Sequence, residues 1–347
     1  AGERWIKRDF DPQDQDPDPE LLKLIYSDEA LLTRLDPPSS TSQPTLVANM
    51  LELLELEPGL KVLEIGAGTG YNAALMWEIV GEEGHITTID IQEEVVEQTR
   101  RLLRAAGYDR IEVIAQDGAY GYPPNQPYDR IVATVGCPDI SFRWAEQLAD
   151  DGFMLIPLQH GGEGFDPLVR IWKEDGKLLG RFVGSSGFMS IRGELEVEQR
   201  ISFAKQRNLQ DEEPTAEYPL FGPLKELSEL REKGHWEEFL AFPLFLAIAD
   251  ERACWGTPGF GLWDESKGAI VVRLKEGKLA LYGDESLYHD LKGLYEQWEG
   301  LGRPGLSEWR LEFFPHNHAR EIPEGERAWV IERKFSQEIV TLAPSPG

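Results

Sequence analysis

The sequence predicts an α/β fold, in which a mainly parallel sheet carries helices on both faces and is followed by a C-terminal α+β domain. Three observations support this prediction. Short apolar segments alternate with amphipathic segments between residues 61 and 157, which is typical of strand–helix–strand units. A glycine-rich turn follows the first apolar segment. Beyond about residue 190 the alternation stops, yet 41% of the 347 residues are hydrophobic, enough to build a second core.

Residues 1–36 are expected to form an N-terminal arm and one helix. The Asp/Pro/Gln-rich stretch 11–19 predicts an extended arm, and residues 20–35 predict a helix that ends at Pro37. A second helix is expected to begin after Ser42, because serine is favoured at the N-cap and apolar residues at helical spacing follow it.

The alternating region predicts the sheet and its covering helices. Strands are expected at 61–65, 85–90, 111–115, 128–134 and 153–157. Helices are expected at 71–80, 93–106 and 141–148, with Gly107 ending the second one. Two further strands, at 168–173 and 178–183, flank Glu174-Asp175-Gly176-Lys177, a sequence typical of a hairpin turn. This hairpin is expected to complete the sheet at about residue 190.

Residues 193–347 are predicted to form a separate α+β domain that recognises the substrate. Helices are expected at 234–250 and 286–299, a hairpin at 268–282, and late strands at 309–314 and 328–333. If this domain is separate, a chain cut after about residue 195 should still bind its cofactor and lose turnover of its own substrate.

The charge composition excludes several classes of function. The 35 Lys and Arg residues face 62 Asp and Glu residues, for a net charge of −27, which disfavours nucleic acid and anionic membrane surfaces as partners. No apolar run of about 18 residues and no signal peptide is evident, so a cytoplasmic protein is expected. Only Cys137 and Cys254 are present, without CxxC spacing, and His316 and His318 lack a nearby third ligand. No disulfide framework and no metal site are therefore expected.

The sequence Gly66-Ala67-Gly68-Thr69-Gly70 is the most informative motif of the chain. It joins a strand to a helix, and its glycines allow a ligand to approach backbone N–H groups at the helix start. The third glycine comes one position too early for a dinucleotide-binding fingerprint. Asp90 ends the next strand, where a carboxylate can bind both ribose hydroxyls, and Asp117-Gly118 follow the third strand, near an adenine edge. Alternatively, the glycines form only a tight turn and Asp90 only caps a helix.

With these motifs the chain resembles class I S-adenosylmethionine-dependent methyltransferases, and among them the protein-L-isoaspartate O-methyltransferase family. The resemblance covers about residues 35–190. It rests on Ser40-Thr41-Ser42-Gln43-Pro44 and on the segments 62–71, 115–118, 128–132 and 148–158. It implies a Rossmann-like seven-stranded sheet within residues 37–192, S-adenosyl-L-methionine as cofactor and S-adenosyl-L-homocysteine as product.

The resemblance also implies site residues. The cofactor would be bound by Glu64, Gly66, Ala67, Gly68, Gly70, Asp90, Ile91, Asp117 and Gly118. Ser42 matches the hydroxyl that lies beside the methyl-accepting carboxylate, with Thr41 as its nearby substitute. The alternative is that Ser42 only caps its helix. Val135, Gly136, Cys137 and Pro138 stand where the family has a loop near the substrate.

The implied reaction is methylation of an aspartyl or isoaspartyl carboxylate, on a side chain or an α-carboxyl group, in a peptide or protein. A carboxylate is already ionised near neutral pH, so the enzyme needs no general base. In the ester, methoxide is a far better leaving group than oxide, and the following amide nitrogen displaces it to close a succinimide (aspartimide).

Several departures from the family pattern suggest a dedicated substrate. The chain continues for a long stretch beyond the expected sheet, and Ser39-Ser40-Thr41 replaces the usual glycine-led approach to the serine. The loop at residues 135–138 also differs from the small-residue loop of the family, and the chain is strongly negative. These features favour a modified ribosomal peptide, such as a lanthipeptide or graspetide. The alternatives are general repair of isoaspartyl proteins, and a non-catalytic cofactor-binding module that recruits a peptide.

Overall fold

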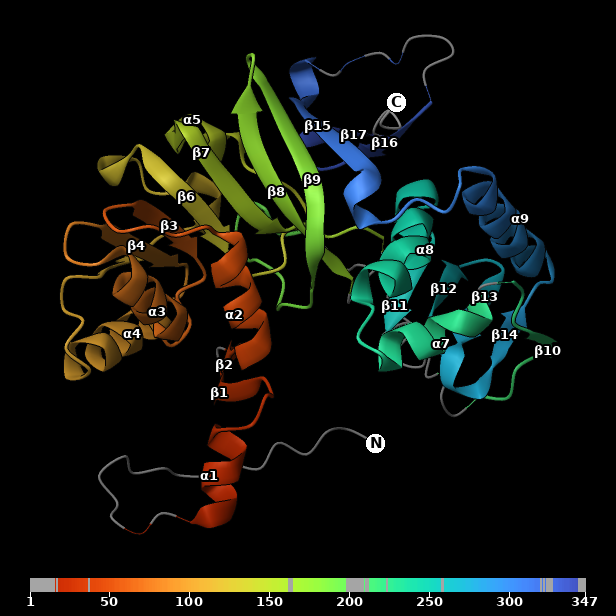
Figure 1. Cartoon of the computed structure of the whole chain (residues 1–347), viewed down its shortest axis with the longest axis horizontal. Coiled ribbons are helices and arrows are strands. Elements are labelled where there is room, and N and C mark those ends of the chain that lie inside the picture. Colours follow the sequence, from red (N-terminus) through yellow and green to blue (C-terminus); the bar gives the residue numbers. More distant parts are fainter. Residues whose placement is uncertain are drawn as a thin grey trace.

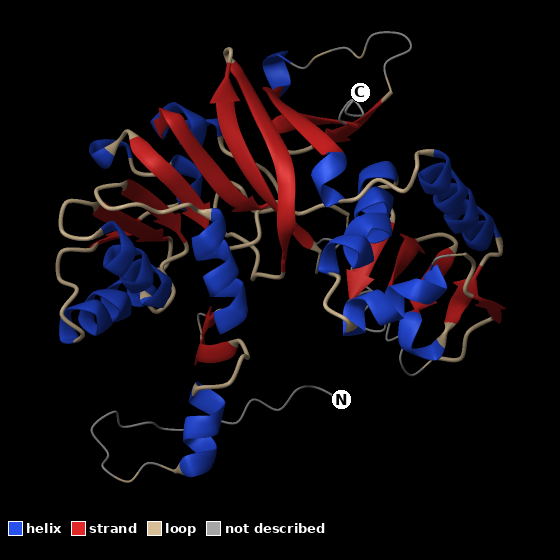
Figure 2. Cartoon of the chain, viewed as in Figure 1, coloured by secondary structure: helices blue, strands red, loops and turns tan. Residues whose placement is uncertain are grey.

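The computed structural model describes residues 16, 18–36, 38–161, 165–197, 209, 212–222, 224–256, 259–318, 320, 322 and 327–342 (Figures 1 and 2). Its largest element is a mixed sheet with the strand order β16-β17-β15-β9-β8-β7-β6-β3-β4-β5. The seven strands from β9 to β5 in this order are those predicted from the sequence. They are β3 (Lys61–Ile65), β4 (His85–Asp90), β5 (Glu112–Ala115), β6 (Tyr128–Ala133), β7 (Leu148–Pro157), β8 (Asp166–Glu174) and β9 (Lys177–Ser186).

Helices cover both faces of this sheet, as the alternating pattern predicts. They are α2 (Pro44–Leu53), α3 (Tyr71–Val80), α4 (Glu93–Ala105) and α5 (Phe142–Gln147). Along β3, Val62 belongs to the core shared with α2, α3 and α4, whereas the next residue, Leu63, belongs to the core shared with α5. Successive side chains of a strand point to opposite faces, so a strand buried on both faces must be apolar throughout. The predicted α/β architecture is confirmed.

The N-terminal prediction is partly wrong. Helix α1 (Pro19–Ile25) ends ten residues before the predicted end at residue 35. The remaining stretch instead forms β1 (Leu31–Leu35), which pairs antiparallel with β2 (Pro38–Thr41). Pairing with a second strand overrode the helical spacing of the leucines, a tertiary effect that local pattern does not contain. Pro37 and most of the stretch 11–19 lie outside the described residues.

Ser42 is not the N-cap of α2, contrary to the sequence prediction. The cap residue is Gln43, which makes no capping bond through its side chain. The carboxylate of Asp28 caps the helix instead. It accepts hydrogen bonds from the backbone N–H (2.8 Å) and the hydroxyl (2.8 Å) of Thr45. The bond from the Thr45 backbone is the largest cause that lowers the pKa of Asp28. The Ser42 side chain is therefore not used by the helix.

The sequence predicts that the sheet ends near residue 190, and this prediction is wrong. Strand β15 (Trp309–Pro315) pairs with β9, and β17 (Ser336–Leu342) and β16 (Ala328–Glu332) extend the sheet beyond it. An edge strand presents unpaired N–H and C=O groups, and β15 satisfies part of this edge of β9. The expected domain 193–347 therefore contributes to two different sheets.

The second sheet is antiparallel and lies beside α8 (Figure 1). Its strands are β10 (Ala216–Pro219), β11 (Ala253–Gly256), β12 (Gly259–Asp264), β13 (Gly268–Arg273) and β14 (Lys278–Gly283), with the helices α7 (Leu224–Glu232), α8 (Trp236–Ala249) and α9 (Ser286–Gly300). Phe245 of α8 stacks on Trp309 of β15 with ring centroids 6.2 Å apart. Because α8 packs on both sheets, one core is continuous from α5 to α9.

Two further properties concern membranes and metals. Within the described residues, every helix is too short or too polar to cross a bilayer. In the same part of the chain, no three His, Cys, Asp or Glu side chains are grouped closely enough to hold a metal ion.

Candidate active site

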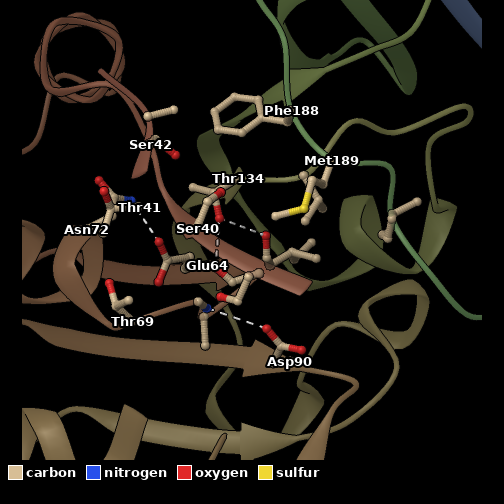
Figure 3. A pocket seen from close by; sticks show the side chains of 18 of the residues that line it. Ser40, Thr41, Ser42, Glu64, Thr69, Asn72, Asp90, Thr134, Phe188 and Met189 are labelled. Atoms are coloured by element: carbon tan, nitrogen blue, oxygen red, sulfur yellow. Dashed lines mark hydrogen bonds between the residues drawn. The ribbon is translucent and has the colours of Figure 1, made fainter. Parts of the chain in front are cut away.

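A cavity of about 600 Å³ lies at the carboxyl ends of β3, β4 and β6 (Figure 3). Three parts of the chain enclose it. The glycine loop after β3 forms one side, and residues 38–43 with the start of α2 form another. Residues 185–192, which we call the wall segment, form the third. In parallel sheets, ligands bind at this end of the strands.

The glycine loop has backbone conformations that require glycine. Gly66 has φ +105°, and a Cβ atom there would lie 2.8 Å from the hydroxyl oxygen of Thr134. Its N–H and that of Ala67 donate to the carbonyl of Ile89, which joins the ends of β3 and β4. Gly68 has φ +52° and, like Gly66 and Ala67, lines the cavity. The loop therefore presents backbone to a ligand without intervening side chains.

Gly70, predicted with the loop, is placed differently. It has φ +80° and does not line the cavity. A Cβ atom at Gly70 would lie 2.9 Å from side-chain carbons of both Thr99 and Leu103 on α4. The third glycine thus permits α3 to pack closely on α4.

Glu64 lies at the carboxyl end of β3 and is buried. Its carboxylate accepts hydrogen bonds from the hydroxyl of Thr88 (2.6 Å) and the amide of Asn72 (2.7 Å). Burial raises the pKa of Glu64 to about 7, even though these two hydrogen bonds favour the ionised form. The carboxyl group therefore titrates near neutral pH.

Asp90 lies at the end of β4 and lines the same cavity (Figure 3). One oxygen accepts from the backbone N–H of Gln92 (3.1 Å) and the other from that of Gly68 (3.4 Å). Burial raises its pKa, and the hydrogen bonds oppose this effect. A carboxylate has about four acceptor sites, so Asp90 keeps capacity for two hydroxyl donors. Ile91, the next residue, also lines the cavity.

Of the two neighbouring residues Asp117 and Gly118, only Gly118 lines the cavity. A Cβ at Gly118 would approach Ile65 to 2.7 Å. Asp117 is not among the lining residues. Its carboxylate instead accepts hydrogen bonds from the backbone N–H groups of Ala119 (2.9 Å) and Glu194 (2.8 Å). Asp117 thereby fixes the chain just beyond the wall segment.

Hydroxyl groups line one side of the cavity, those of Ser39, Ser40, Thr41 and Ser42. Ser39 and Ser40 lie beside the glycine loop, because a Cβ atom at Gly68 would lie 3.9 Å from Oγ of Ser39 and 3.6 Å from the carbonyl oxygen of Ser40. Figure 3 shows Ser42 and Phe188 at the end opposite Asp90. Within the described part of the chain, the Ser42 hydroxyl has no hydrogen-bond partner. It is thus available to a bound molecule.

Of the predicted substrate loop, only Val135 lines the cavity. Gly136 pairs with the wall segment: its N–H donates to Met189 (2.9 Å) and its carbonyl accepts from Ile191 (2.9 Å). Pro138 is buried. Cys137 is fully buried, and burial raises its pKa, so its thiol is not a reactive nucleophile. This loop supports the wall segment from behind.

Several cavity residues carry no sequence signal of their own. The wall segment follows the last predicted strand without a recognisable motif, and Thr88, which does not line the cavity but binds Glu64, resembles any strand threonine. Asn72 was detectable in principle, because it lies in the first turn after the glycine loop, one position beyond Tyr71.

These residues fit S-adenosylmethionine. The volume lies within the range of small-molecule sites, roughly 300–1,000 Å³. Glu64 and Asp90 supply negative charge for a cationic ligand, and Asp90 has acceptor capacity for ribose hydroxyls. The side-chain oxygen of Gln92, a lining residue, is buried without a partner in the described structure and can accept a hydrogen bond from a ligand amino group.

Comparison with known proteins identifies a family. The family model of protein-L-isoaspartate(D-aspartate) O-methyltransferase matches residues 18–196. Protein-L-isoaspartate O-methyltransferase 2 of Archaeoglobus fulgidus is 44% identical over 154 residues, 44% of this chain and 69% of that protein. The enzyme of Methanopyrus kandleri is 43% identical over 155 residues, 44% of this chain and 68% of that protein.

A solved structure extends the similarity beyond this region. A protein-L-isoaspartate O-methyltransferase structure matches with a TM-score of 0.50 and 26% sequence identity, covering 86% of each chain. With its glycine loop, carboxylates and hydroxyl-lined cavity, the chain belongs to the protein-L-isoaspartate(D-aspartate) O-methyltransferase family and is an S-adenosylmethionine-dependent carboxyl O-methyltransferase.

Proposed function

We propose that this enzyme methylates the α-carboxylate of L-isoaspartyl residues in proteins and peptides. The observation that carries the proposal is one continuous cavity that is lined by two carboxylates and has the hydroxyl of Ser42, unpaired among the described residues, at the end opposite Asp90. The carboxylates suit a cationic cofactor, and the hydroxyls suit an anionic acceptor.

The acceptor needs orientation rather than activation. When bound, S-adenosylmethionine supplies an electrophilic methyl group on a positively charged sulfur. A carboxylate oxygen attacks the methyl carbon, and the electron pair of the broken carbon–sulfur bond remains on sulfur. Opposite charges cancel as this bond forms, so exclusion of water by the cavity walls favours the reaction.

The proposed residue roles follow from position. Asp90 accepts hydrogen bonds from the ribose hydroxyls, Glu64 faces a cationic part of the cofactor, and Gly66 and Gly68 allow its close approach. Ser42 donates a hydrogen bond to the methyl-accepting carboxylate, with Thr41 beside it. In a repair pathway the resulting ester closes to a succinimide with release of methanol, and hydrolysis of the succinimide returns part of the material to aspartate.

One comparison favours general repair over a dedicated modified peptide. The long C-terminal part favours a special substrate only if repair enzymes have no such part. A structure named protein-L-isoaspartate O-methyltransferase covers 86% of this chain, including much of that part. The extension by itself is therefore no sign of a ribosomal peptide substrate.

The test compares two linear peptides that differ only in an isoaspartyl or aspartyl linkage. Transfer of a labelled methyl group should be strongly selective for the isoaspartyl peptide. Ser42→Ala should lower kcat/KM about tenfold, the effect of one lost hydrogen bond to a charged group. Ser266→Ala, in an exposed turn of the second sheet, is the matched control and should leave it unchanged.

Three results would contradict the proposal. Equal labelling of both peptides would remove the isoaspartyl specificity. Labelling only of a constrained cyclic peptide would instead favour the ribosomal peptide substrate, and cofactor binding without any labelling would favour a non-catalytic module.

A further inference from the structure

The turn between β16 and β17, residues 333–336, is fixed to the methyltransferase part of the chain by buried polar groups. We call it the C-terminal turn. Nη1 of Arg333 donates to the carbonyls of Pro138 (2.8 Å) and Gln159 (2.8 Å). Its guanidinium also pairs with Glu338, which is fully buried and accepts a hydrogen bond from His160 (2.9 Å). Such a buried group of charges is costly unless every member is partnered.

The next residues of the turn continue these contacts. The carboxylate of Asp139, fully buried, accepts from the N–H of Phe335 (2.5 Å) and the hydroxyl of Ser336 (2.6 Å). Pro138 and Asp139 immediately follow Gly136 and Cys137. Both residues that the turn contacts here therefore belong to the loop that supports the wall segment.

The wall segment is bonded to that loop and to two buried side chains. Gly136 exchanges backbone hydrogen bonds with Met189 and Ile191. The carboxylate of Asp166 accepts from the N–H of Phe188 (3.2 Å), and the amide of Gln159 donates to the hydroxyl of Ser190 (3.3 Å). Gln159 thus contacts the wall segment through its side chain and Arg333 through its carbonyl.

The exposed residue of the turn holds the chain beyond the wall segment. The ammonium of Lys334 donates to the carbonyls of Glu194 (2.8 Å) and Glu196 (3.0 Å). Asp117 holds the N–H of Glu194 from the opposite side. The segment is therefore fixed near its middle through Arg333 and Asp139, and after its end through Lys334.

We propose that the C-terminal turn positions the wall segment for the methyl acceptor, so that this part of the C-terminal extension completes the active site. Arg333 and Lys334 are positioning residues, because they act through backbone groups and do not line the cavity. Within the described residues, Glu64 of β3 and Asp90 of β4 make no contact with the turn. The wall segment also borders the expected cofactor site, because a Cβ atom at Gly118 would lie 3.4 Å from the side chain of Ile191. Loss of a turn contact should therefore weaken binding of the peptide more than binding of the cofactor. This inference rests on the proposed isoaspartyl substrate.

The test uses the full-length chain with Lys334→Met, which keeps an apolar stem and removes two hydrogen bonds. The matched control is Lys173→Met, because Lys173 also donates to a backbone carbonyl, that of Leu148 (2.7 Å), at the other end of the sheet. Arg333→Lys is the second variant and retains the positive charge. We expect Lys334→Met to raise KM for the isoaspartyl peptide about fivefold to tenfold, with kcat and Tm unchanged and the Kd of S-adenosylmethionine changed by no more than about twofold.

Hydrogen exchange supplies a readout that needs no substrate. Amides of residues 187–194 should exchange faster in Lys334→Met and Arg333→Lys, while those of β3 and β4 keep their protection. If the wild-type protein methylates no isoaspartyl peptide, the proposed function is wrong. The hydrogen-exchange result then still tests whether the C-terminal turn holds the wall segment in place. Unchanged exchange, or a loss of peptide and cofactor binding together with a lower Tm, would overturn the positioning role.

Discussion

We predict that Glu64 makes cofactor binding depend on pH. Its pKa is raised from 4.5 to about 7, because the carboxylate is buried and Thr88 and Asn72 only partly compensate. This rise corresponds to about 3 kcal/mol that the folded apo protein spends on the ionised form above pH 7. A cation beside Glu64 can recover up to this amount. Below the pKa, binding must first remove the proton.

The expected Kd of S-adenosylmethionine is nearly constant above about pH 8 and rises about tenfold between pH 8 and pH 6. Calorimetry at these pH values, in two buffers of different ionisation enthalpy, should detect release of about half a proton on binding near pH 7. In Glu64→Gln, which is neutral at every pH, both the pH dependence and the proton release should disappear. The apo protein should also lose stability as pH rises from about 4.5 to 7, because the folded state holds a proton that the unfolded chain releases.

A single result would refute this reasoning. If the wild-type Kd at pH 6 and pH 8 agreed within about twofold, Glu64 would not face a cationic part of the cofactor. A pH dependence that survives in Glu64→Gln would assign the titration to another group, such as Asp90, whose pKa burial also raises.

The remaining predictions concern the cofactor site and the C-terminal strands. Asp90→Ala should weaken S-adenosylmethionine by about 1–3 kcal/mol in calorimetry, since polar groups are left unpaired, and an unchanged affinity would exclude the ribose contact. Gly70→Ala should lower Tm through contact with Thr99 and Leu103, and a Tm equal to that of wild type would show that α3 and α4 separate readily. The sequence led us to expect that a chain cut after residue 195 still binds its cofactor, but β15 and α8 complete its core, so we now expect this fragment to fail to fold and to bind no cofactor. A cooperative thermal transition in that fragment would contradict this.

The sequence predicts the parallel sheet well because its central strands are buried on both faces and its helices each have one buried face. Those are local patterns with fixed periods. The glycine loop and Asp90 are equally detectable, since a ligand at a strand end demands particular residue types. The helix predicted at 20–35 fails because β1 depends on a partner strand, which no local pattern contains.

The C-terminal part could not be placed from the sequence for a different reason. Strand β15 is recognisable as a strand, but its partner β9 lies far back in the chain, and nothing in either segment specifies the pairing. The Arg333 side chain likewise donates to the backbone carbonyls of Pro138 and Gln159. Because every residue has a backbone carbonyl, the sequence does not specify these contacts. Their consequence for the site becomes visible only in three dimensions.

The way in which the large sheet is completed has a consequence for synthesis. Strand β9 ends at Ser186, and its neighbour β15 begins only at Trp309, so the whole second sheet is made between two adjacent strands. On the ribosome, the edge of β9 stays unpaired while that sheet emerges, and an unpaired edge is prone to join other chains. Fast folding of the intervening residues, which are mostly local antiparallel pairs and helices, shortens this exposed period. Translation pauses before residue 309 would prolong it, and we expect them to lower the yield of folded enzyme.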